Sequence, residues 1–173
     1  INNLKIAALF HDLANIVKFD FVKHPEFLGE AQKDLNYWIE QQRLIIERYG
    51  KDDHEATNKM LNEIGVSDTI KNIISLKSFG NAIEVRNSNN LEAKILLYAD
   101  LRVGPFGIIP LQERINDLTT RLEKYRNRLD LPELISACQN IENEISRISR
   151  KDINKLSESE LSINDSELVD TNV

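Results

Sequence analysis

The stretch IAALFHDLANIVKFD, from Ile6 to Asp20, decides how the rest of the chain is interpreted. Its apolar residues recur at helical spacing, yet the adjacent pair His11-Asp12 lies inside this apolar run. Burying a carboxylate and an imidazole costs free energy unless each finds a partner. One interpretation is a satisfied polar pair near a helix surface. The other is a pair of metal ligands, because an imidazole nitrogen and a carboxylate oxygen both suit a divalent ion.

The composition favours an all-helical globular chain. The 173 residues include only 6 Gly and 4 Pro, 41% are hydrophobic and 29% are charged. No strand pattern of period two persists, and we expect one helical domain over residues 1–150 and a turn-rich loop at 104–110. The apolar pattern and the capping residues predict helices over about 3–17, 30–49, 52–64, 67–76, 79–86, 90–103, 110–128 and 131–148.

Charge and cysteine content narrow the class of protein. The net charge is −6 without a basic stripe, which argues against general nucleic-acid binding. The single cysteine, Cys138, reads as a small core residue, cannot form an internal disulfide and fits a reducing, cytoplasmic compartment. No apolar run reaches membrane-spanning length, so no membrane partner is expected. The segment 151–173 is acidic, serine-rich and free of aromatic residues, and we expect a disordered tail that folding does not need.

A second carboxylate also lies in an apolar segment. Asp100 stands within LEAKILLYADLRV, residues 91–103, a helix that is apolar nearly all round and should therefore be interior. An ionised aspartate in that position needs a cation or several hydrogen-bond donors. The candidate partners of the Asp100 carboxylate are Arg102 or Lys94, hydrogen-bond donors near the helix end, or a metal ion.

Three segments, IAALFHDLANIV, KDDHEATNKMLNEIG and LLYADLRVGPFGIIPLQERI, in this order, resemble the HD-domain superfamily of metal-dependent phosphohydrolases. The resemblance covers roughly residues 1–128. It implies an HD-domain-like helical bundle in which a His, a His-Asp doublet and a distal Asp bind a metal. His11, Asp12 and Asp100 match the last three of these ligands. The family's first histidine lies one helix before the doublet, so we expect the chain to be truncated at its N-terminus.

The residues after the doublet depart from the family motif His-Asp-x-Gly-Lys. Ala14 stands where many members have glycine, and Asn15 stands where they have lysine. On a continuous helix, His11, Asn15 and Lys18 would occupy positions i, i+4 and i+7 on one face. Asn15 and Lys18 could then contact a phosphate group. The alternative for Lys18 is a solvated lysine near a helix end.

His54 occupies a position where family members with two metals have a histidine ligand. The sequence after Ile74 reads Ser-Leu-Lys-Ser and offers no further histidine pair, so a second metal is not expected. His54 would instead line the pocket or donate to a phosphate. The alternative is a first-turn helix histidine beside Asp52 and Asp53. His24, in VKHPEF, is expected on a surface loop.

The resemblance implies metal-assisted hydrolysis of a nucleotide or another small phosphoester. The metal would lower the pKa of a bound water, and Asp12 would orient or deprotonate that water. The ligand set suits Mn, Fe, Co, Ni, Zn or Mg. The altered residues after the doublet favour an alternative, a catalytically degenerate HD-fold module that binds or regulates without turnover. A plain helical interaction domain is the third candidate.

Overall fold

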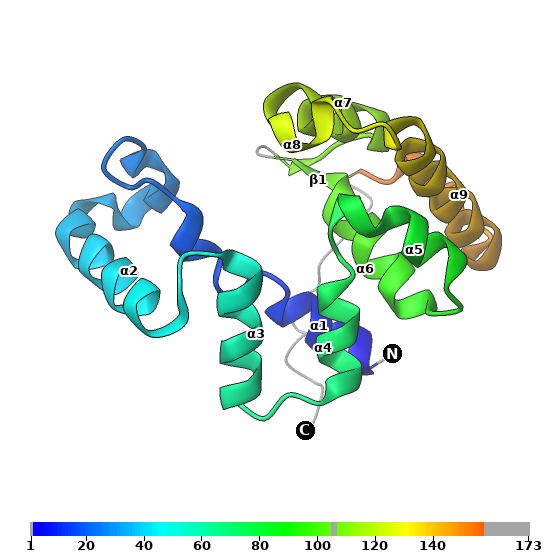
Figure 1. The fold of residues 1–173 in the computed structure, drawn as a ribbon. Coiled ribbons are helices and arrows are strands. Elements are labelled where there is room, and N and C mark those ends of the chain that lie inside the picture. The colour runs from blue at the N-terminus through cyan, green and yellow to red at the C-terminus, as the bar shows by residue number, and fades with distance from the viewer. Residues whose placement is uncertain (1, 105–106, 158–173) are drawn as a thin grey trace. The chain divides into compact units, whose positions relative to one another are not determined.

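The computed structural model describes residues 2–104 and 107–157. The chain forms two compact units, Ile1–Ser75 and Leu76–Val173 (Figure 1). Helices dominate both units, which confirms the predicted all-helical class. Within the described residues, no helix is both long and apolar enough to cross a membrane. The grouping of residues 1–150 into one HD-like domain stays a prediction.

The first unit is built from helices that pack in pairs. Helix α1 packs on α4, while α2 and α3 contact each other and the 3-10 helix η1. The side chain of Asp52 accepts a hydrogen bond from the amide of Glu55 at 2.8 Å and so caps α3. The elements described in this unit are α1 Asn2–Phe10, η1 Asn15–Lys18, η2 Pro25–Asp34, α2 Leu35–Tyr49, α3 Asp53–Glu63 and α4 Asp68–Ser75.

A small apolar cluster holds η1 against α2 and α3. Ala14, Val17 and Ala56 are buried at its centre. Larger side chains from α2 and α3 surround them, including Ile45 and Met60. The segment that directly follows the His11-Asp12 doublet is therefore fixed by tertiary packing.

The predicted first helix over residues 3–17 is wrong beyond Phe10. Helix α1 ends there, a turn follows, and η1 is wound more tightly, as the hydrogen bond from the Val17 amide to the Ala14 carbonyl at 3.0 Å shows. A 3-10 helix brings residues three apart onto the same side. With this winding Ala14 and Val17 both face the apolar cluster, and their contacts with α2 and α3 accompany the departure from the predicted α-helix.

The second unit has a single larger core. Helix α9 packs against α5 and α6, and α7 packs against α6 and α8. Strands β1 and β2 form a short antiparallel hairpin that the sequence did not predict, because two-residue strands are too short to alternate. The described elements are η3 Phe79–Asn81, α5 Ala82–Asn87, α6 Leu91–Arg102, β1 Val103–Gly104, β2 Gly107–Ile108, α7 Leu111–Arg121, α8 Glu123–Arg126, α9 Leu131–Ser149 and η4 Ile153–Lys155.

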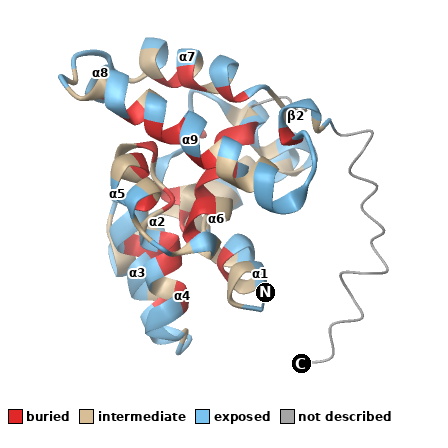
Figure 2. Cartoon of the chain, turned by 90° about the vertical axis from the view of Figure 1, so that its right-hand side faces the viewer, coloured by how far each residue is buried: buried red, intermediate tan, exposed pale blue. Residues whose placement is uncertain are grey.

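Helix α6 is interior, as its apolar composition predicted. Most of its residues are buried, and Figure 2 shows the burial along its length. Asn90 caps the helix by accepting a hydrogen bond from the Ala93 amide at 3.0 Å. The predicted helix over 110–128 is in contrast interrupted at Leu122, whose backbone is extended (φ −104°, ψ 108°).

Buried Arg102, at the end of α6, organises the neighbouring segments. Its Nε donates to the Ile109 carbonyl at 2.6 Å, and Nη1 donates to the Ile153 carbonyl at 2.7 Å. Its Nη2 donates to the Leu156 carbonyl at 3.0 Å, and Nη1 also donates to the Tyr98 hydroxyl. Several oriented carbonyl dipoles thus satisfy a guanidinium that is only 6% exposed.

The first part of the expected tail is packed. Ile153 is 4% exposed, and η4 packs on α9. For Ile153 to Leu156 this packing differs from the disordered segment expected from the average composition, which does not reveal two apolar residues in packing positions. That folding does not need the segment stays a prediction. Residues 158–173 lie outside the described residues.

Replacing Arg102 with methionine should lower the free energy of unfolding by about 3 kcal/mol, because several buried carbonyls lose their donor. Urea denaturation followed by circular dichroism measures this change. The control is Arg121→Met, since the Arg121 side chain is 56% exposed and pairs with Asp117. The control should cost less than about 1 kcal/mol. Equal losses in both variants would contradict the organising role of Arg102.

Cys138 on α9 should be unreactive in the folded protein. The residue is 2% exposed, and burial, with the nearby charge of Glu142, raises the pKa of its thiol to about 12. Only the thiolate reacts, so we expect labelling by Ellman's reagent at pH 8 to be at least about 100-fold slower in native than in urea-unfolded protein. Similar rates would show that the thiol is accessible.

Candidate metal and phosphate site

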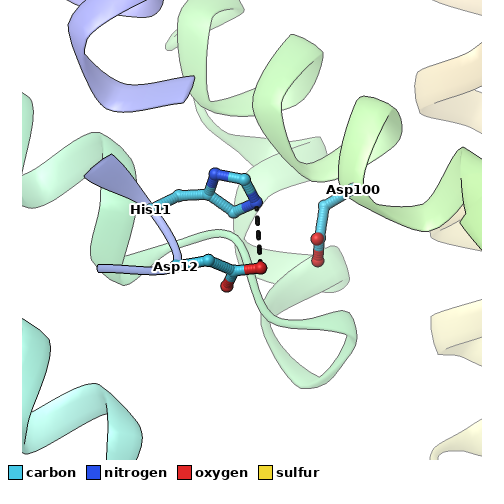
Figure 3. A group of neighbouring side chains, drawn as sticks. All are labelled: His11, Asp12 and Asp100. Carbon is cyan, nitrogen blue, oxygen red and sulfur yellow. Dashed lines mark ion pairs between the residues drawn. The ribbon is translucent and has the colours of Figure 1, made fainter. Parts of the chain in front are cut away.

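His11 and Asp12 lie in the turn between α1 and η1, and their side chains face each other (Figure 3). Nε2 of His11 is 3.5 Å from Oδ2 of Asp12, and Nδ1 of His11 is 2.7 Å from the carbonyl oxygen of Ala8. A carbonyl oxygen only accepts, so Nδ1 carries a hydrogen. In the neutral ring, Nε2 then presents its lone pair toward the carboxylate.

This geometry fits a pair of metal ligands. A cation can bridge a lone pair and a carboxylate oxygen that face each other at this distance, either as a proton on Nε2 or as a metal ion. Ligands about 2.1 Å from a tetrahedral ion lie about 3.4 Å apart, close to the separation of the His11 and Asp12 atoms. Metal-binding histidines also commonly donate their second ring N–H to a backbone carbonyl, as His11 does to Ala8.

Asp100, also labelled in Figure 3, belongs to the second unit, near the end of α6. Its side chain is half-buried. Lys94 and Arg102, the two cations considered as its partners, also contact other groups: Lys94 donates to Glu144 at 2.8 Å, and Arg102 donates to the carbonyls described above. The role of Asp100 as a ligand beside His11 and Asp12 stays a prediction.

Lys18 joins the end of η1 to the first turn of α3. Its Nζ donates to Oδ2 of Asp53 at 3.0 Å, so Lys18 is ion-paired rather than merely solvated. Partial burial alone would raise the pKa of Asp53, but the hydrogen bond and charge of Lys18, with a contribution from His54, hold that pKa below its usual value. His54 is exposed in the first turn of α3, and its role toward a phosphate stays a prediction.

The expected alignment of His11, Asn15 and Lys18 on one helical face is wrong, because α1 ends before the doublet. Asn15 and Lys18 are three apart in η1 and so still lie on the same side of it. His24 is exposed, and its Nδ1 lies 3.0 Å from Oε1 of Glu26. This confirms its assignment to the surface.

No sequence pattern indicated a role for Gln42 on α2. Its Nε2 donates to the carbonyls of Ile16 at 2.6 Å and Phe19 at 2.7 Å. These bonds hold the chain on both sides of Lys18 and so help to direct its side chain. The only hint was a polar residue next to the apolar stripe of α2, which does not reveal a partner 26 residues away.

Comparison of the chain with protein-family models, with curated proteins and with solved structures finds no match. The resemblance to the HD-domain superfamily therefore depends on the three sequence segments quoted above. Within the first unit, Nε2 of His11 lies 3.5 Å from Oδ2 of Asp12, and Nζ of Lys18 lies 3.0 Å from Oδ2 of Asp53.

Replacing Gln42 with leucine should lower the free energy of unfolding by about 1 kcal/mol, because two carbonyls lose their donor. Trp38, the chain's only tryptophan, lies on the same helix, so its fluorescence can follow urea unfolding of this region. The matched control is Gln32→Leu, whose side chain is exposed and whose effect should lie within about 0.5 kcal/mol. An unchanged free energy of unfolding in Gln42→Leu would show that the two hydrogen bonds do not stabilise the segment around Lys18.

Proposed function

We propose that this chain belongs to a metal-dependent phosphohydrolase that acts on a nucleotide or another small phosphoester. His11, Asp12 and Asp100 are the proposed metal ligands. The observation that carries the proposal is the orientation of His11, whose Nδ1 hydrogen bond to Ala8 directs Nε2 toward the Asp12 carboxylate. The HD-domain resemblance supports Asp100 as the additional ligand.

Each proposed site residue has a chemical role. A bound divalent ion, one of Mn, Fe, Co, Ni, Zn or Mg, supplies Lewis acidity and an acidified water. The second oxygen of the Asp12 carboxylate can accept a proton from that water or orient it. Lys18 contributes positive charge toward the phosphate, and Asn15 and His54 are the proposed donors to it.

A specific observation also favours the alternative, an HD-fold module that binds or regulates without turnover. Ala14, at the position of the family's glycine, is fully buried beside Val17 and Ala56. Asn15 carries no charge where the family has lysine, and the nearby Lys18 is engaged with Asp53. A site with so little available positive charge would bind phosphate weakly in the absence of metal.

Metal binding tests the ligand assignment. After EDTA treatment and dialysis, wild-type protein should bind a divalent ion, measured by calorimetry and elemental analysis. Asp12→Ala and Asp100→Ala should each weaken the affinity by at least about tenfold, because loss of even an outer partner commonly costs that much. The control is Asp20→Ala, which removes an exposed carboxylate paired with Lys23. Unchanged affinity in both ligand variants would refute the proposed site.

Turnover separates the enzyme from the binding module. We expect hydrolysis of p-nitrophenyl phosphate or bis(p-nitrophenyl) phosphate with at least one of the six metals, and a loss of at least about 100-fold in Asp12→Ala. Activity that survives both aspartate substitutions would place the chemistry elsewhere. Nucleotide binding without hydrolysis under every metal would favour the regulatory module.

A further inference from the structure

We propose that Asp53 competes with the phosphate group of the ligand for Lys18 and thereby sets the affinity of the site. This inference rests on the phosphate contact assigned to Lys18 in the proposed function. The proposed function does not assign Asp53 to the metal or to the substrate. Its role would be to hold Lys18 in place before binding and to release it when a phosphate arrives.

The contact between the two side chains is specific and tertiary. The Nζ–Oδ2 distance is 3.0 Å, and the residues lie 35 positions apart on η1 and α3. The Lys18 side chain is 45% exposed, whereas that of Asp53 is 23% exposed. An anion from solvent can therefore reach the ammonium group while the carboxylate stays beneath it.

The other acidic residues at the start of α3 have different partners. The Asp52 carboxylate accepts the hydrogen bond that caps the helix, at 2.8 Å from the Glu55 amide. The Glu55 carboxylate lies 2.8 Å from Nζ of Lys59 in the next turn. Asp53 is thus the carboxylate of this turn that is directed at Lys18.

The charges of the groups explain why a phosphate can replace Asp53 as the partner of Lys18, and why Asp53 then weakens phosphate binding. An ion pair between partly exposed groups is weak, while a phosphate dianion offers more charge and more acceptor oxygens. The carboxylate that gives up Lys18 remains close to the bound phosphate and repels it. Removing the charge of Asp53 should therefore tighten phosphate binding by about two- to fivefold, the range expected for such a pair.

The experiment is an NMR titration of EDTA-treated protein with inorganic phosphate at pH 7.5 and low ionic strength. Asp53→Asn should tighten the dissociation constant by about two- to fivefold, and Asp53→Glu, which keeps the charge, should stay near wild type. Lys18→Ala should weaken binding. The matched control is Asp20→Asn, because Asp20 pairs with Lys23 at the same 3.0 Å distance on the same unit and should leave binding unchanged.

The variants separate failure of this inference from failure of the proposed function. If Lys18→Ala leaves phosphate binding unchanged, or if no variant binds phosphate, the phosphate contact itself is refuted and the inference falls with it. If Lys18→Ala weakens binding but Asp53→Asn does not tighten it, only the competition by Asp53 is overturned. Tightening in Asp20→Asn as large as in Asp53→Asn would also overturn it, since the effect would then be general electrostatics. Circular dichroism of each variant verifies folding.

Discussion

The packing of Ala14 and Val17 against Ala56 is the constraint on which the candidate site depends. Both residues face this cluster where the chain is wound as the 3-10 helix η1, and α1 ends before the doublet. His11 and Asp12 consequently lie in a turn, where adjacent side chains can face each other rather than diverge around a helix. The same winding brings Lys18 to the first turn of α3.

Charged groups in both units are satisfied by partners from distant segments. In the second unit, backbone carbonyls from the hairpin end and from η4 surround Arg102. In the first unit, Lys18 finds a carboxylate on α3. The two cases differ in burial: Arg102 is enclosed and its role is structural, whereas Lys18 is partly open to solvent and can exchange its partner.

The geometry of the His11-Asp12 pair depends on how the imidazole is oriented and on whether a cation lies between the two side chains. The hydrogen bond to Ala8 fixes the imidazole by using its Nδ1 hydrogen. In the neutral ring, Nε2 then carries a lone pair that can accept a proton or bind a metal. A proton or a metal ion can then bridge Nε2 and the carboxylate. The arrangement is therefore suited to metal binding, and the carbonyl of Ala8 orients its first ligand.

The sequence alone determined the all-helical class, the interior position of α6 and the candidate residues His11 and Asp12. These features follow from local periodicity and from side-chain chemistry, which neighbouring residues specify. Only the tertiary structure decided where α1 ends and that Lys18 pairs with Asp53. It also showed that Gln42 holds the chain on both sides of Lys18. Each of these depends on contacts between segments more than 20 residues apart, and a local pattern carries no information about such partners.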